Sequence, residues 1–340
     1  MATCMPRSAM IGMNCKPTLL MTAFVAWAAA MPAWSADAFA QRDFPTRSVR
    51  MVNPYTPGGS VDLVGRAVAG GLSEIWKEQV IVDNRPGAGT MIGTEIVVRA
   101  EPDGYTVLCT SSAIAIIRSM YLNMRFDPVR DLTPVILIAN SPSILVVHPS
   151  LPAQSVGELI ALAKAQPGQI PAASSGVGTT THLTLQMFKT MAHADLLHVP
   201  YKGGGPALAD LIGGQVKVFF NTPGLMWSHV ASGRLRPLAI TSAQRMEFAP
   251  DLPTVAEAGV PGFEASIWYG IYGPKNFPAA LTQRWNDAVN RYLKSPQAQE
   301  YYRRAYMTVM GGTPAAFASF HNSETVRWGA IVASAGIKPQ

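Results

Sequence analysis

A Pro-Gly-Gly-Ser turn at residues 57–60 has the clearest chemical meaning of any segment in this sequence. It follows a short apolar strand at 49–52 and precedes a helical pattern with apolar residues on one face between 61 and 72. Such a turn leaves backbone N–H groups free at a helix N-terminus, where the helix dipole favours negative charge. Because the turn contains no lysine or arginine, it suits a carboxylate held by backbone and hydroxyl donors. The alternative is a tight turn that needs glycine only for its backbone.

A second turn of the same kind lies at residues 174–180, with the sequence Ser-Ser-Gly-Val-Gly-Thr-Thr, and leads into the helix of His182. If both turns face one cleft, a ligand with two carboxylates, or with one carboxylate and a polar tail, would bridge them. A third turn at 201–206 adds a phenol and a cation. The alternative is a set of unrelated structural turns.

Motifs for catalysis, cofactors and metals are weak. Thr181 occupies the third glycine position of a dinucleotide motif that would begin at Gly176, and neither a G-x-S-x-G nor an H-E-x-x-H motif occurs. His193 and His198 are five residues apart, so hydrogen-bonded loop histidines are favoured over a metal site. Asp62, one turn into its helix, is expected to cap it. We therefore predict no catalytic residue, no metal and no cofactor.

Composition narrows the class of protein further. The formal net charge is +6, and the charges are scattered rather than clustered, which argues against nucleic-acid binding. Residues 1–40 carry a basic start, an apolar run at 19–30 and small residues near 36–40, which predict a secretory signal peptide cleaved near Ala36 to Ala40. Cys109 is the single cysteine after that segment and is expected to be a buried, inert thiol. These patterns predict a soluble, exported protein.

Strand-like and helix-like segments alternate from residue 49 to 241, and the chain becomes purely helical after about 278. This order predicts an α/β protein with two lobes, in which two hinge strands cross between the lobes and the helical tail packs on the first lobe. A cleft between the two lobes follows from this arrangement. We assign residues 41–146 and 267–340 to lobe 1 and residues 147–266 to lobe 2.

Several motifs in order resemble the Bug, or TctC-like, solute receptors of tripartite tricarboxylate transporters. They are Tyr-Thr-Pro-Gly-Gly at 55–59 with Asp62 and Arg66, Asn-Arg-Pro-Gly-Ala-Gly at 84–89, Pro-Asp-Gly-Tyr at 102–105, His-Val-Pro-Tyr-Lys-Gly at 198–203, and Pro-Thr at 253–254 with Glu257. The resemblance extends from about Phe44 to Lys338. It implies a periplasmic receptor with a Venus flytrap fold, similar to type II periplasmic binding proteins, that has no catalytic activity. Such a receptor delivers a small carboxylate to a membrane permease with TctA-like and TctB-like subunits. Because a receptor that closes about a hinge is usually a monomer, we expect a monomer.

The resemblance also implies a set of ligand-binding residues. In such receptors a carboxylate is held by a first-lobe loop and by a glycine-rich loop of the second lobe. The corresponding residues here are Tyr55, Pro57, Gly58, Gly59 and Asp62 in the first lobe, and Ser174, Gly176, Gly178, Thr179 and His182 in the second. Further residues expected at the edge of the pocket are Ser111, Ser112, Tyr201 and Asn221.

One segment departs from the family pattern. After Ser112 and Ala113 the family usually has a histidine and then Asn-Pro, whereas this chain has Ile-Ala-Ile-Ile-Arg at 114–118. If this segment lines the cleft, it adds apolar surface and a guanidinium, so an aromatic carboxylate joins the di- and tricarboxylates as a candidate ligand. Two other functions stay open: an orphan receptor that signals to a sensor kinase, and a periplasmic hydrolase or isomerase on the same fold.

Overall fold

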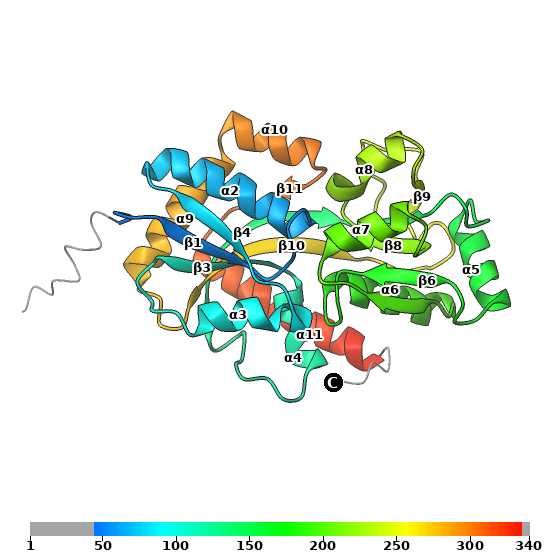
Figure 1. Cartoon of the computed structure of the whole chain (residues 1–340), viewed down its shortest axis with the longest axis horizontal. Helices are drawn as coiled ribbons and strands as arrows, with labels where there is room; N and C mark the ends of the chain where they lie inside the picture. The colour runs from blue at the N-terminus through cyan, green and yellow to red at the C-terminus, as the bar shows by residue number, and fades with distance from the viewer. Residues whose placement is uncertain (1–43, 335–340) are drawn as a thin grey trace, which may run out of the picture. The chain divides into compact units, whose positions relative to one another are not determined.

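The computed structural model describes residues 44–334, which form two β-sheets flanked by helices (Figure 1). The first sheet has the spatial order β11 (Thr308–Val309), β4 (Leu132–Pro142), β10 (Ser266–Pro274), β3 (Thr106–Ser111), β1 (Val49–Asn53) and β2 (Val80–Asn84). The second has the order β7 (Leu197–Pro200), β6 (Pro171–Ser174), β8 (Val218–Asn221), β5 (Ile144–Val147) and β9 (Arg236–Ile240). The predicted two-lobe α/β fold is confirmed. The exact lobe boundaries stay a prediction, and the predicted signal peptide lies outside the described residues.

In each sheet, the strands that lead into the glycine-rich turns pair in parallel with their neighbours. In the first sheet β1 pairs in parallel with β2 and β3, whereas β10 is antiparallel to β3 and β4. In the second sheet β6 pairs in parallel with β7 and β8, and β5 is antiparallel to β8 and β9. Parallel neighbours need a crossover, so each turn after β1, β6 and β7 leads directly into a helix.

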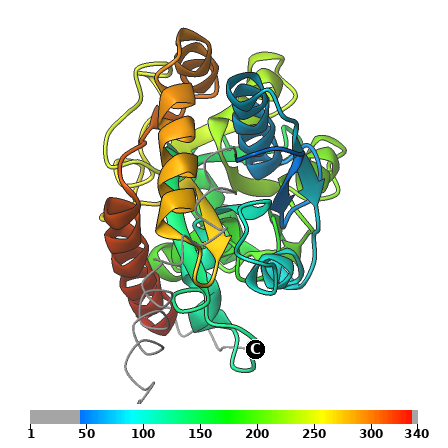
Figure 2. The ribbon, with the colours of Figure 1, turned by 90° about the vertical axis from the view of Figure 1, so that its left-hand side faces the viewer.

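Helices cover both faces of the first sheet (Figure 2). One face carries α2 (Ser60–Trp76), α9 (Ala279–Leu293) and α10 (Pro296–Arg304), and the other carries α3 (Met91–Val98), α4 (Ala113–Met120) and α11 (Pro314–Ser334). A short 3-10 turn, η1 (Ala88–Thr90), precedes α3. Strand β3 serves both cores, because Cys109 packs against the first helix layer and Leu108 against the second. The C-terminal helices therefore pack on the first lobe, as predicted.

The second sheet is covered in the same way. Helices α5 (Val156–Ala165) and α6 (Thr180–Ala192) belong to one core cluster, and α7 (Gly204–Ile212) and α8 (Pro223–Ala231) belong to the other. The Ser155 hydroxyl accepts the Glu158 N–H at 3.1 Å and so caps the start of α5.

The chain passes between the two sheets at two adjacent points. Strand β4 ends at Pro142 in the first sheet, β5 starts at Ile144 in the second, and Ser143 lies between them. The buried Thr241 hydroxyl accepts the Ser143 N–H at 2.7 Å and lies 2.6 Å from the Ala265 carbonyl oxygen, just before the return crossing. One side chain thus links both crossings.

A buried carboxylate attaches α11 to the first sheet. Glu324 Oε2 accepts hydrogen bonds from the indole N–H groups of Trp268 and Trp328, each at 3.0 Å, and both tryptophans are fully buried. The other oxygen accepts a bond from Arg327 at 3.1 Å, so the charge of Glu324 is paired. If this acceptor were removed, neither buried indole N–H could form a hydrogen bond with water instead.

We predict that Glu324→Ala destabilises the protein by about 2–5 kcal/mol, because two buried N–H donors lose their partner. Glu324→Gln keeps a carbonyl oxygen at the same place and should cost less than half as much. Urea unfolding of the ligand-free protein measures both values. Equal stability of Glu324→Ala and the unchanged protein would contradict this role.

Candidate functional site

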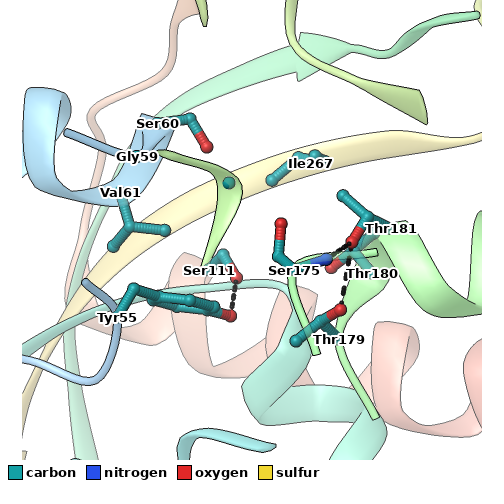
Figure 3. Close-up of a pocket in the computed structure, with 11 residues that line it drawn as sticks. Tyr55, Gly59, Ser60, Val61, Ser111, Ser175, Thr179, Thr180, Thr181 and Ile267 are labelled. Atoms are coloured by element: carbon teal, nitrogen blue, oxygen red, sulfur yellow. Dashed lines mark hydrogen bonds between the residues drawn. The ribbon is translucent and has the colours of Figure 1, made fainter. Parts of the chain in front are cut away.

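A narrow cavity lies between the two lobes, and we call it the interlobe cavity (Figure 3). Its empty volume, counted with the solvent space that opens from it, is about 310 Å³. Tyr55 and Ser111 lie on one side of it, and Ser175 and the turn at 179–181 lie on the other. The full lining is Tyr55, Gly59, Ser60, Val61, Ser111, Ser175, Thr179, Thr180, Thr181, Gly204 and Ile267.

Three helices begin at this cavity. Gly59, Thr179 and Gly203 are the N-cap residues of α2, α6 and α7, and the first residues of each helix line the cavity. The first N–H groups of a helix have no partner inside the helix. Neither α2 nor α7 has a side-chain cap. Free N–H groups and the positive ends of three helix dipoles are therefore directed at one small space, which favours an anion.

The lining is otherwise neutral. It contains hydroxyl groups and no charged side chain. The Tyr55 hydroxyl lies 2.8 Å from Ser111 Oγ, and burial raises the pKa of Tyr55, so both groups stay protonated and can donate a hydrogen bond. A carboxylate in this space would meet donors from the backbone and from hydroxyls without a competing acid.

Asp62 supports the first turn from behind. Its carboxylate accepts hydrogen bonds from the Gly58 N–H, Arg66 Nε and Asn84 Nδ2, each at 2.9 Å. Burial opposes ionisation, but these bonds and the Arg66 charge lower the pKa of Asp62 overall. With its oxygens occupied and its side chain buried, Asp62 positions the turn rather than facing the cavity.

Two stacked histidines support the second turn. The rings of His182 and His198 lie 4.2 Å apart between centroids. His182 Nδ1 accepts the Gly178 N–H at 3.2 Å, and His198 Nε2 lies 2.6 Å from Ser174 Oγ. Burial lowers the pKa of His182 to about 3, with further contributions from the nearby His198 and Lys189, and it lowers that of His198 to about 4. Both imidazoles are therefore neutral near pH 7.

Direct contacts join the lobes around the cavity. Ser112 Oγ lies 2.5 Å from Thr180 Oγ1, and the Thr56 N–H bonds to the Lys202 carbonyl oxygen at 3.3 Å. Further away, the ring of Tyr306 packs 4.0 Å from that of Phe248. These contacts describe a closed arrangement of the two lobes.

The residues proposed from the sequence occupy three kinds of position. Tyr55, Gly59, Ser111 and Thr179 line the interlobe cavity, and Gly176 and Tyr201 line a neighbouring recess with Tyr55. Others hold the turns or join the lobes and do not line the cavity themselves. They are Pro57, Gly58, Asp62, Ser112, Ser174, Gly178 and His182.

Asn221 and Tyr201 differ in what they can offer a ligand. Asn221 Oδ1 accepts the Thr222 N–H at 2.7 Å, which leaves Nδ2 buried, without a partner, and close to the backbone of Gly204. That amide nitrogen is therefore an unpaired buried donor. The Tyr201 hydroxyl instead donates to Asp210 at 2.7 Å. Burial and this carboxylate raise the pKa of Tyr201 to about 12, so its hydroxyl is already used within the lobe.

Sequence reasoning missed part of the lining. These residues are Ser60, Val61, Ser175, Thr180, Thr181, Gly204 and Ile267. Ser60, Val61, Thr180, Thr181 and Gly204 are the first residues of their helices, so the signal was present in each predicted helix start. Ile267 comes from β10 and has no local signal.

Residues 114–118 do not line the cleft, so the condition for an aromatic ligand is not met. They form helix α4, whose Ile114, Ile116 and Ile117 are fully buried in the core. Arg118 is turned outward, 3.7 Å from Asp127. This segment therefore adds neither apolar surface nor a guanidinium to the cavity, and it gives no support to an aromatic ligand.

Three other features of residues 44–334 bear on function. Burial, together with the charge of Asp62, raises the pKa of Cys109 to about 12, so its thiol is a poor nucleophile. Across these residues, no cluster of three His, Cys, Asp or Glu side chains is arranged to hold a metal ion. None of the helices in this range combines the length and apolar character that a membrane span requires.

Comparisons with known proteins agree on the kind of molecule. Residues 64–337 match the model of the TctC family, described as the tripartite tricarboxylate transporter family receptor. Protein BugT of Bordetella pertussis is 35% identical over 93% of this chain and 96% of its own length. The structure of Rpa4515 of R. palustris with adipate has a TM-score of 0.84 and 36% identity, over 87% of this chain and all of that one. The structure of MatC of Rhodopseudomonas palustris with bound malate has a TM-score of 0.80 and 26% identity, over 85% of this chain and all of that one.

The neutral state of His182 predicts a pH dependence of stability. The pKa of His182 is about 3 in the folded protein and about 6.5 in an unfolded chain, so the unfolded chain binds an extra proton between these values. This contribution to stability is complete above about pH 6.5 and falls as the pH decreases, by up to about 1.4 kcal/mol per pH unit.

We predict that in His182→Asn the free energy of unfolding declines less steeply as the pH falls, by up to about 1.4 kcal/mol per pH unit, the value for one proton. The fold should be kept, since the asparagine oxygen can still accept the Gly178 N–H. His198 and His321, whose pKa values are also lowered, remain in both proteins and cancel in the comparison. Urea unfolding at about pH 5, 6 and 7 gives the slope. Identical slopes for the variant and the unchanged protein would rule out a buried, neutral His182.

Proposed function

Because this chain belongs to the TctC family of tripartite tricarboxylate transporter receptors, a family of periplasmic solute-binding proteins, we propose that it captures a small carboxylate and delivers it to a membrane permease. The observation that carries the proposal is the meeting of three helix N-termini at a neutral, hydroxyl-lined cavity. Adipate in one relative's structure and malate in another support the same class of ligand. The proposal includes a periplasmic location, export by the segment at 1–40, and a monomeric state.

Binding would proceed by closure of the lobes. The turn at 57–60 belongs to the first lobe, and its donors are present whether the lobes are open or closed. The donors of α6 and α7 join it only when the second lobe approaches. A buried carboxylate is costly unless its oxygens are hydrogen-bonded, so complete saturation is expected only in the closed form. Both crossings between the lobes, near Ser143 and Ala265, are the candidate hinge.

The hydrogen-bond partners of the polar groups near the cavity favour a binding role over catalysis. Ser111 is hydrogen-bonded to Tyr55 rather than to a base. The nearest supporting histidine, His182, accepts a backbone N–H and does not line the cavity. A nucleophile with an adjacent base, which a hydrolase needs, is not assembled among the lining residues. A receptor that signals to a sensor kinase would use the same site, so the adjacent genes and the partner distinguish it from a transport receptor.

We predict that Gly59→Val weakens binding of dicarboxylates by about 100-fold or more. The backbone of Gly59 has an ordinary extended conformation, so valine is tolerated in the open form. A Cβ there would lie 3.5 Å from the Gly204 nitrogen and 3.7 Å from the Gly205 nitrogen, so the γ-carbons of valine would obstruct closure. Calorimetric titration with adipate and with malate measures the loss.

Gly70→Val is the matched control, because Gly70 lies on the exposed side of the same helix with nothing within 4 Å of a Cβ. It should bind like the unchanged protein. Normal affinity of Gly59→Val would contradict the proposed site.

We also predict that Asn221→Asp weakens carboxylate binding by about 100-fold. The substitution preserves the oxygen that accepts the Thr222 N–H but replaces the free donor by a negative charge. The melting temperature, measured beside the affinity, checks that the variant is folded. Unchanged affinity in a folded variant would remove Asn221 from the site.

A further inference from the structure

Helix α6 of the second lobe places two leucines in two different cores. Leu185 belongs, with Phe188 and Phe220, to a core cluster of the second lobe. Leu183, two residues earlier on the same helix, instead belongs to the cluster that α3, α4 and α11 form on the first sheet. Both leucine side chains are fully buried. Leu183 therefore reaches across the boundary between the lobes into the core of the first.

The first lobe makes the reciprocal contact through α11, which extends toward the second lobe in Figure 1. Ile331, in the last turn of α11, packs against core clusters of both lobes. One turn earlier, the Arg327 guanidinium donates a hydrogen bond to the Glu264 carbonyl oxygen at 3.2 Å. Glu264 directly follows Phe263, a residue of the second-lobe core. An apolar and a polar contact thus join α11 to the second lobe.

Leu183 lies on the part of α6 that moves when the cavity opens. Thr180, in the first turn of α6, lines the interlobe cavity, and its hydroxyl oxygen lies 2.5 Å from Ser112 Oγ of the first lobe. Residues three apart are neighbours on one side of a helix, so Leu183 follows Thr180 along the side of α6 that faces the first lobe. Opening the cavity withdraws this side of α6 and exposes the Leu183 side chain to water, which is unfavourable.

Leu183 has no direct part in holding a ligand. It lines neither the interlobe cavity nor the neighbouring recess that contains Gly176 and Tyr201. Its side chain has no group that could donate a hydrogen bond to a carboxylate. Any influence of Leu183 on affinity therefore acts through the equilibrium between the open and closed forms.

We infer that Leu183 and Ile331 form an apolar latch, which stabilises the closed form of the protein with or without a ligand and slows the release of a bound ligand. The inference rests on the proposed function as a receptor that closes on a carboxylate. Because the latch contributes to the closed form itself, it changes the affinity for every ligand by the same factor. It also raises the closed fraction of the unliganded protein.

The first test is Leu183→Ala, which removes most of an apolar side chain from the latch. We expect the variant to release adipate and malate about tenfold faster or more, by the same factor for both acids, because the lost burial favours the open form. Stopped-flow fluorescence measures the two dissociation rates. Small-angle X-ray scattering of the unliganded proteins should give a larger radius of gyration for the variant, since more of its molecules are open.

Leu185→Ala is the matched control, because it shortens a buried leucine of the same helix that belongs to the core of its own lobe. It should lower the melting temperature by at least as much as Leu183→Ala, since it leaves a cavity in the second-lobe core. The release rates of both acids should stay within about twofold of those of the unchanged protein.

Ile331→Ala tests the first-lobe side of the latch at a partly buried position, and it decides the test if Leu183→Ala does not fold. It should speed the release of both acids about threefold or more, because less apolar surface is buried on closure. Val326→Ala is its control, since Val326 lies on the same helix and is 74% exposed. This control should leave release and the radius of gyration unchanged.

Unchanged release from both latch variants, equal acceleration in Leu185→Ala, or an effect limited to one of the two acids would overturn the inference and leave the proposed function intact. Failure of both acids to bind the unchanged protein would instead contradict the proposed function. The scattering measurement then decides the inference alone. Equal radii for the unliganded Leu183→Ala variant and the unchanged protein would in that case overturn it.

Discussion

The structure depends on one electrostatic constraint, which is the meeting of three helix N-termini at a space that contains no charged side chain. The starts of α2, α6 and α7 bring partial positive charges and unpaired N–H groups together. Without an acceptor, these groups repel one another and lack hydrogen bonds. An anion or water has to satisfy them, and a carboxylate does so with charge-assisted bonds from neutral donors.

The charged and titratable side chains next to the turns do not line the cavity but hydrogen-bond to the turns. Asp62 fixes the first turn through three hydrogen bonds, and the stacked pair of His182 and His198 fixes the second. All three side chains hold the backbone donors in place without competing for the ligand. This division explains why residues implied by the family resemblance include several that never reach the cavity.

Much of the fold could be predicted from the sequence, because the strand-helix alternation and the glycine turns are local signals. The helix after the turn at 57–60 begins at Ser60, and the helices of the C-terminal tail begin at or directly after Pro278, Pro296 and Pro314. Helix α4 was missed, because the burial of its apolar residues at 114–117 depends on α11, about two hundred residues later in the chain. A local sequence pattern does not indicate a packing partner so far away in the chain.

The residues of the site were also predicted only in part. Loop residues such as Gly59 and Thr179 were identified because their turns are distinctive in the sequence. The contacts of a side chain could not be predicted, since only in the folded lobe does the Tyr201 hydroxyl donate to Asp210 and the Asn221 amide nitrogen become buried without a partner.

The most direct test of the central claim is a crystal structure of the protein with a carboxylate that it binds in solution. The account predicts one carboxylate in the interlobe cavity, within hydrogen-bond distance of the first N–H groups of α2 and α6, with the lobes closed around it. A ligand found outside this cavity, or one whose carboxylate points away from the helix N-termini, would contradict it.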